Sequence, residues 1–308
     1  MKRDNKERLD DEIDLLELFS IAWNRKFFII ILTSVFAIFS VFYSLSLPNV
    51  YSSSSLLAPS SQNNSVSSSS LGGMSGLASL AGVNISSSNA SKSDEAIQRI
   101  QSFEFFTNYF LPNIKLEDLM AIEKWIAESD SIIYSEEIFN NKTKKWVNID
   151  SDSKKLSPST QKAFKRYKQI LGISKDDITG FITISIQHQS PIVAKNWVEL
   201  IVYNINESMR ELDKLDAKNA INFLNQSSNS TSVQSIREVI NRLLESKMQT
   251  LMLASSNKAY IFKTIDSPIA PEVKSGPVRS FICIMGTLIG LIVSMIIVFI
   301  GHYIRKPS

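Results

Sequence analysis

Two long apolar stretches, one near each end of the 308-residue chain, limit its possible folds more than any other feature. Residues 27–47 and 281–301 contain no Asp, Glu, Lys or Arg. A helix of about 20 apolar residues, rising about 1.5 Å per residue, crosses the roughly 30 Å hydrocarbon core of a bilayer. We therefore expect a membrane protein with transmembrane helices at 27–47 and 281–301.

The charges that flank these stretches predict which way the helices run. Basic residues precede the first stretch at 25–26 and follow the second at 305–306. Such flanks favour the cytoplasmic side of a membrane, so we expect cytoplasmic segments at 1–26 and 302–308 and an external domain at 48–280. A cleaved signal peptide is the less favoured alternative for the first stretch, because the apolar core of a signal peptide has only about 7–15 residues.

Composition argues against several kinds of chemistry. The chain has 33 Lys plus Arg against 30 Asp plus Glu, and this net charge of +3 gives no strong field for a polyanion, so we expect no nucleic acid partner. Two histidines and one cysteine cannot build a Cys/His metal site, and Cys283 lies inside the second apolar stretch. A phosphate loop, a nucleophile elbow and a dinucleotide fingerprint are absent from the sequence. Acidic pairs at 135–137 and 175–177 fit solvated loops better than a catalytic site, so we expect no catalytic residue, no metal and no cofactor.

The external domain begins with a Ser-rich segment, residues 52–91, whose composition fits a mobile polar linker. The apolar patch SGLASLAGV within it leaves a second interpretation open, a packed segment or one that contacts a partner. Beyond this segment, apolar spacing predicts a helix over 93–111 that stops at Pro112, and a second helix that ends with Gly172 as its C-cap. The alternation in GFITISIQH predicts a half-buried strand.

The longest periodic segment predicts an extended helical arm at 190–255. Pro191 suits the first helical turn, and a three-or-four spacing of apolar residues continues to about Gln226, on the order of 50 Å. The polar run SSNSTS then breaks the pattern before a second helix resumes. The stripe of the first helix fits either an intramolecular core or a seam between subunits; its residues are Trp197, Ile201, Ile205, Ser208, Leu212 and Leu215.

A strand-like segment lies next to each apolar stretch. YSSSSLL follows the first, and KAYIFKTID precedes the approach to the second. Pairing them in one sheet would bring the two membrane anchors together at the base of the external domain, and we state this pairing as a hypothesis.

Two small groups of residues are candidates for contacts. Gly286, Gly290 and Ser294 recur every four residues, which places small side chains on one helix face so that another helix can approach closely. In the external domain, Lys144 and Lys145 adjoin Trp146, a combination able to meet a sugar ring and an acidic group. A lysine-rich hairpin or loop with one anchoring aromatic is the favoured alternative for this second group.

The order of these features resembles the polysaccharide co-polymerase, or chain length determinant (Wzz-like), family. The resemblance is carried by DEIDLLELFSIAWNRKFFIIIL at the first stretch, by the GLASLAG patch, by ITISIQHQSPIVAKNWVELIVYNIN at the long helix and by IDSPIAPEVKSGPVR before the second stretch. It implies an α+β membrane protein in which two transmembrane helices flank a periplasmic α/β base domain with a long extended helical arm.

The resemblance also implies a role. Members of the family form rings in the bacterial inner membrane, carry no catalytic residues and set the modal length of a lipid-linked, O-antigen-type surface polysaccharide. We therefore expect a homo-oligomer whose partners are a separate polysaccharide polymerase, the lipid-linked glycan and the membrane. The approach to the second helix, formed by Pro268, Pro271, Gly276 and Pro277, then resembles a rigid collar that fixes how that helix enters the base; a plain linker is the alternative.

Some relatives continue past the second helix into a cytoplasmic tyrosine kinase. Only HYIRKPS follows here, so we expect no fused kinase in this chain. Two other functions stay open at this point. One is a partner of a separate kinase and exporter in capsule or exopolysaccharide secretion, docking through DEIDLLELF, and the other is a membrane-anchored sugar sensor.

Overall fold

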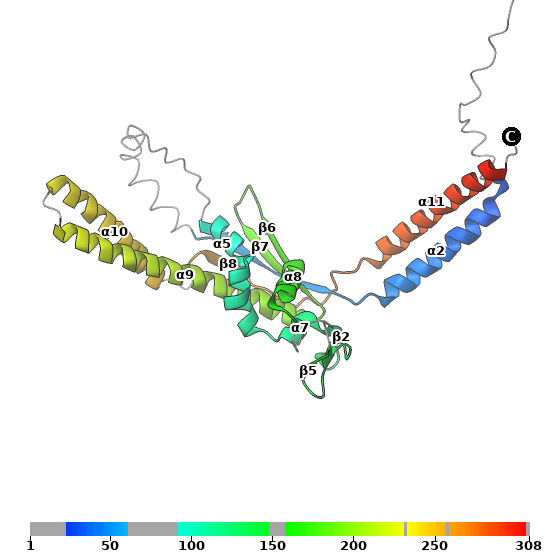
Figure 1. Cartoon of the computed structure of the whole chain (residues 1–308), viewed down its shortest axis with the longest axis horizontal. Helices are drawn as coiled ribbons and strands as arrows, with labels where there is room; N and C mark the ends of the chain where they lie inside the picture. The colour runs from blue at the N-terminus through cyan, green and yellow to red at the C-terminus, as the bar shows by residue number, and fades with distance from the viewer. Residues whose placement is uncertain (1–22, 61–91, 148–157, 231–232, 257–258, 306–308) are drawn as a thin grey trace, which may run out of the picture. The chain divides into compact units, whose positions relative to one another are not determined.

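The structure, a computed structural model, describes residues 23–60, 92–147, 158–230, 233–256 and 259–305 (Figure 1). The chain divides into two units. One comprises Met1–Asn49 with Ser275–Ser308, and the other comprises Val50–Lys274. The Ser-rich segment and its SGLASLAGV patch lie, from residue 61 onward, outside the described residues.

The terminal unit contains two apolar helices, α2 (Lys26–Ser46) and α11 (Arg279–Arg305). Both are long and apolar enough to cross a membrane, as judged by length and composition. They pack against each other as an antiparallel pair, and large apolar side chains such as Phe39 and Ile284 remain exposed on their outer sides. Such an exposed apolar surface suits a lipid environment.

The central unit is built on a four-stranded antiparallel sheet in the order β6-β7-β1-β8. Its strands are β1 (Tyr51–Pro59), β6 (Leu171–Lys175), β7 (Ile182–His188) and β8 (Phe262–Asp266). β1 pairs with β8, which confirms the hypothesis that the strand-like segments next to the two apolar stretches share one sheet. The predicted strand is present as β7, where alternate isoleucines are fully buried.

Short helices cover the core of the central unit. In chain order they are α5 (Lys92–Ile100), α6 (Phe103–Phe105), the π-helix η2 (Phe106–Phe110), the 3-10 helix η3 (Leu111–Asn113), α7 (Leu116–Met120) and α8 (Thr160–Ile170). Their aromatic side chains meet in the core, where the ring of Phe110 lies 4.6 Å from that of Tyr167 and 5.4 Å from that of Trp197. The hydroxyl of buried Tyr167 donates to the carbonyl of Ile100 at 3.0 Å, and burial raises the pKa of this phenol.

Two local predictions for these helices were wrong. The continuous helix expected over 93–111 breaks after Ile100, because the side chain of Ser102 caps a new helical segment by accepting the N–H of Phe105 at 3.1 Å. Gly172 is not a C-cap, because α8 ends at Ile170 and Gly172 lies in β6. A Cβ atom on Gly172 would lie 2.5 Å from the hydroxyl of Ser185, so this glycine permits close packing within the sheet.

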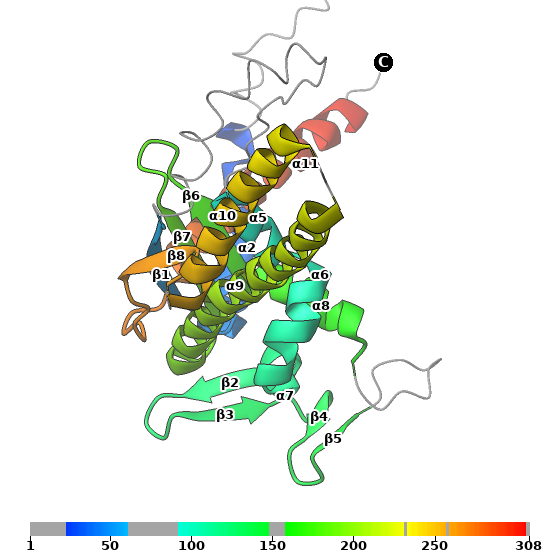
Figure 2. The same ribbon diagram turned by 90° about the vertical axis from the view of Figure 1, so that its left-hand side faces the viewer.

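The helical arm consists of α9 (Pro191–Ser230) and α10 (Gln234–Ser256), which lie side by side and extend away from the sheet (Figures 1 and 2). The first helix continues beyond its expected end near Gln226. The apolar stripe is buried from Trp197 to Ser208, where α9 packs on β1 and β7, but Leu215 is 56% exposed. The intramolecular-core interpretation therefore holds for the first four of the six stripe residues.

Two small hairpins complete the central unit and lie beside each other (Figure 2). One pairs β2 (Ile122–Ile126) with β3 (Ser131–Tyr134), and the other pairs β4 (Phe139–Asn140) with β5 (Lys145–Trp146). The first hairpin was not predicted from the sequence.

Candidate functional site

The three small residues of α11 all face α2. A Cβ atom added to Gly286 would lie 2.5 Å from the Cβ of Ser40, and one added to Gly290 would lie 2.5 Å from the Cβ of Phe36. One turn further, the hydroxyl of fully buried Ser294 lies 3.5 Å from that of Thr33. These helices approach so closely only because side chains are absent or small at these positions.

Polar contacts strengthen this helix pair. The hydroxyl of Ser40 donates to the carbonyl of Ile282 at 2.9 Å, and Arg279 donates to the side chain of Asn49 at 3.2 Å. The second bond lies at the end of the pair where α2 stops and α11 starts. α2 and α11 are thus held together both by packing and by hydrogen bonds.

The predicted proline collar is divided between the two units. Pro268 is buried and Pro271 half-buried in the central unit, while Gly276 and Pro277 belong to the terminal unit. Two serines of β1 bind the backbone on either side of Pro268. Ser53 donates to the carbonyl of Ile269 at 2.7 Å and Ser55 to the carbonyl of Asp266 at 2.8 Å.

The Lys144, Lys145 and Trp146 group lies on the β4–β5 hairpin. Asn140 shapes its turn, because its side-chain oxygen accepts the N–H groups of Lys142 and Thr143, each at 3.0 Å. Trp146 packs edge-on against Phe139 with ring centroids 5.1 Å apart, whereas Lys144 and Lys145 are exposed. The group therefore lies on a hairpin with one anchoring aromatic residue, and its two lysines are accessible for contacts.

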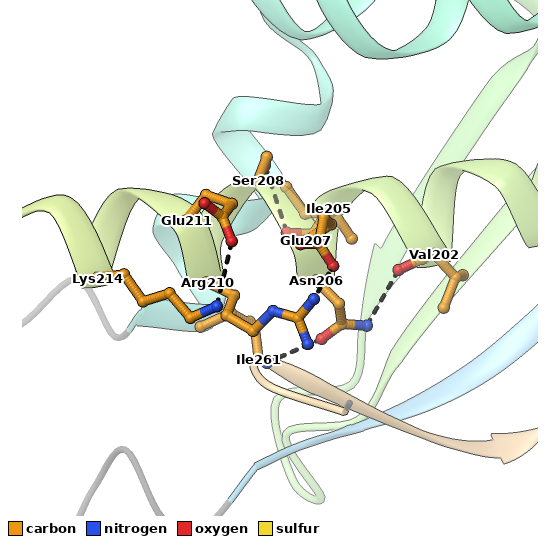
Figure 3. Close-up of polar contacts among 9 residues, drawn as sticks. All are labelled: Val202, Ile205, Asn206, Glu207, Ser208, Arg210, Glu211, Lys214 and Ile261. Carbon is orange, nitrogen blue, oxygen red and sulfur yellow. Dashed lines mark hydrogen bonds and ion pairs between the residues drawn. The ribbon is translucent and has the colours of Figure 1, made fainter. Parts of the chain in front are cut away.

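Asn206 of α9 links the arm to the sheet by hydrogen bonds (Figure 3). Its Oδ1 accepts the N–H groups of Ile261 at 2.8 Å and Phe262 at 2.9 Å. Its Nδ2 donates to the carbonyls of Val202 at 3.0 Å and Phe262 at 3.2 Å. All four hydrogen-bonding valences of a buried amide are used, which fixes where β8 begins relative to α9.

A second fastening lies nearly two helical turns further along α9. The carboxylate of Asp213 accepts the hydroxyl of Tyr260 at 2.5 Å and forms an ion pair with Lys92. Burial, and then the hydrogen bond to Asp213, raise the pKa of the Tyr260 phenol. Asp213 thus ties the first residue of α5 and the segment before β8 to the arm.

Two ion pairs within the same helix have little energetic weight (Figure 3). Arg210 pairs with Glu207, and Lys214 pairs with Glu211 at 3.2 Å. The hydrogen bond from Arg210 lowers the pKa of Glu207. Pairs of this kind contribute about 0.2–0.5 kcal/mol each, so they do not mark a binding site.

A buried histidine joins the end of β7 to α7. His188 Nδ1 accepts the N–H of Ser190 at 3.0 Å, so Nε2 carries the proton and donates to the carbonyl of Asp118 at 2.9 Å. Burial lowers the pKa of His188. The Asp118 carboxylate in turn accepts the hydroxyl of Tyr134 at 2.5 Å, which ties the β2–β3 hairpin to the same cluster.

Sequence reasoning singled out none of Asn206, Asp213 and His188 as site residues. The only local signal for Asn206 and Asp213 is a polar residue next to an apolar stripe, and such residues are also common on solvated faces. Within the described ranges, no group of three or more His, Cys, Asp or Glu side chains is placed to hold a metal ion.

The comparison with curated proteins gave no match. Among solved structures, a full-length bacterial polysaccharide co-polymerase aligns over 97% of this chain and 99% of its own, with 14% identity and a TM-score of 0.39. A fragment of WzzB, the polysaccharide co-polymerase of Salmonella Typhimurium, aligns over 74% of this chain and 100% of its own, with 11% identity and a TM-score of 0.29.

The comparison with family models gave a match that covers the first apolar helix, strand β1, the helices α5 and α6, and most of η2. The chain length determinant protein (Wzz) family matches residues 11–109. Residues 11–109 of this chain are therefore similar to the chain length determinant family, which confirms the resemblance seen in the sequence for that part.

Proposed function

We propose that this protein regulates the chain length of a lipid-linked surface polysaccharide of the O-antigen type. The observation that carries the proposal is the match of residues 11–109 to the chain length determinant family. The architecture agrees with it, because two candidate membrane helices flank an α/β unit with a long helical arm. In this proposal the protein lies in the bacterial inner membrane, both termini are cytoplasmic, and residues 48–280 are periplasmic.

The proposed mechanism is scaffolding by a closed homo-oligomer. A ring of copies holds a separate polymerase and the growing glycan together, and its size or affinity sets when the chain is released. No chemical step is assigned to this protein. Lys144, Lys145 and Trp146 are proposed to contact glycan, and the proline collar is proposed to hold the second helix at the base of the external domain.

Exposed apolar residues on the arm support the oligomer. On α9, Leu215 is 56% exposed and Phe223 is 67% exposed, and α10 carries further exposed apolar side chains at Val239 and Leu243. Exposed apolar residues repeated along two helices favour a seam with another subunit. Replacing both Leu215 and Phe223 by serine should shift the detergent-solubilised protein toward smaller assemblies in mass photometry. Asn219→Ser, at an exposed position between them, is the matched control, and an unchanged assembly in the double variant would contradict the seam.

The length-regulating function is tested by the surface polysaccharide of cells that lack the gene. Deletion should turn a clustered distribution of glycan lengths on a gel into an unclustered one while total sugar persists, and the intact gene should restore the clusters. If deletion instead abolishes surface polysaccharide, length control is the wrong function. The role of a secretion partner working with a separate kinase would then replace it.

A further inference from the structure

A pocket of about 300 Å³ lies between the two apolar helices, at the end where α2 begins and α11 finishes. Its lining has two kinds of side chain. Asn24, Arg25 and His302 supply polar groups, while Phe28, Ile297 and Val298 supply apolar surface. A pocket lined by both polar groups and apolar side chains suits an amphiphile better than a free ion or a wholly apolar molecule.

Gly301 lines this pocket, and the absence of a side chain there leaves space open. A Cβ atom on Gly301 would meet no atom within 4 Å, whereas one on Gly286 or Gly290 would collide with α2. Gly301 is therefore not needed for the helix contact, although it lines the pocket. A larger side chain at this position would fill the pocket and leave the α2–α11 contact unchanged.

The pocket carries the positive charge of Arg25, which favours an anionic ligand. Residues 23–49 and 275–305 contain no Asp or Glu, so these parts of the terminal unit offer no carboxylate to neutralise Arg25. The backbone carbonyl of Arg25 accepts the N–H groups of Phe28 at 3.0 Å and Ile29 at 3.2 Å, which holds this residue at the start of α2. The neighbouring Lys26 is directed elsewhere, with its ammonium 4.8 Å from the ring centroid of Trp23.

We propose that this pocket binds the phosphate headgroup of an anionic phospholipid. The Arg25 guanidinium donates two parallel hydrogen bonds to phosphate oxygens, a geometry that an ammonium group cannot reproduce. Asn24 and His302 supply further donors, and the apolar wall contacts the first carbons of the acyl chains. Anionic lipids are concentrated at cytoplasmic membrane surfaces, where the basic flank of α2 is expected. The inference rests on the proposed membrane placement but not on control of glycan length.

The test uses the full-length protein in nanodiscs of phosphatidylcholine, with and without phosphatidylglycerol. Native mass spectrometry then counts the phosphatidylglycerol molecules that stay bound after transfer to detergent. Arg25→Gln should weaken retention about tenfold or more, as expected for the loss of charge-assisted hydrogen bonds, and Gly301→Leu should weaken it by filling the pocket. Lys26→Gln removes the same charge next to the pocket and should stay within about twofold of the wild type.

Three outcomes would overturn the proposal. Equal losses from Arg25→Gln and Lys26→Gln would mean general attraction of lipid to a basic surface. Retention unaffected by Gly301→Leu would mean that the pocket is not the site. If inorganic phosphate added to phosphatidylcholine nanodiscs binds with the same dependence on Arg25, the ligand is soluble phosphate and not a lipid.

Carbonate extraction of cell membranes separates this proposal from the one on which it rests. A chain that is released into the supernatant would refute the membrane placement and the lipid site together. A chain that stays in the membrane but retains no phosphatidylglycerol refutes the lipid site alone.

Discussion

Asn206 offers the sharpest test of how the arm is attached to the sheet. Its side chain is 7% exposed and accepts the N–H groups of Ile261 and Phe262, both of which are 1% exposed. The variant Asn206→Ala removes this acceptor and also the amide donor to the carbonyl of Phe262. Water cannot readily replace the lost partners, because the surroundings are buried.

The magnitude follows from counting the buried groups left without partners. Two buried N–H donors lose their acceptor, at about 1–3 kcal/mol each. Alanine returns about 0.5–0.7 kcal/mol through its higher helix propensity. The expected net loss is about 3 kcal/mol, which corresponds to roughly a hundredfold at about 1.4 kcal/mol per factor of ten. The loss is expected first where β8 meets α9.

Hydrogen exchange measured by mass spectrometry on the full-length protein in detergent reports this directly. Peptides that contain Ile261 and Phe262 should lose about a hundredfold in protection in Asn206→Ala. Asn219→Ala is the matched control, because Asn219 is exposed on the same helix and the substitution there should leave exchange of β8 unchanged. A loss of less than about tenfold, or an equal loss in the control, would refute the attachment of β8 through Asn206.

Three further predictions concern other contacts. Because burial lowers the pKa of His188, the folded state binds fewer protons than the unfolded state. The free energy of unfolding should therefore be highest above pH 6.5, the ordinary pKa of histidine, and should fall below it by at most about 1.4 kcal/mol per pH unit. His188→Asn should flatten this pH dependence, measured by urea unfolding at several pH values, and the charges of Asp118 and Arg166 remain in the variant. A profile as steep as that of the wild type would contradict the role of His188. Gly290→Leu should separate α2 from α11 and destabilise their contact by about 1–3 kcal/mol, measured as a longer distance between spin labels on the two helices, whereas an unchanged distance would count against close packing. Tyr260→Phe should lower the free energy of unfolding by about 1 kcal/mol through the lost hydrogen bond to Asp213, and no change in the urea midpoint would show that this bond contributes nothing.

The sequence by itself determined the elements whose signal is local and repeated. The charge-free stretches predicted α2 and α11, and the alternation of Ile182, Ile184 and Ile186 predicted β7. The three-or-four spacing after Pro191 predicted α9. Each of these patterns persists over many residues, because one face of the element is buried or in contact with lipid along most of its length.

Only the tertiary structure decided the features that depend on residues distant in sequence. Ser102 interrupts a periodic apolar pattern, because its capping bond and the packing of Phe106 and Phe110 against Tyr167 and Trp197 favour a break over a continuous helix. The β2–β3 hairpin has only a weak local pattern and is joined to the cluster of Asp118 and His188 by the hydroxyl of Tyr134. The same holds for the pocket between α2 and α11 and for the attachment of the arm by Asn206. The segments that meet there, α2 with α11 and Asn206 with the start of β8, lie 55 residues or more apart along the chain, and no local periodicity encodes contacts over that separation.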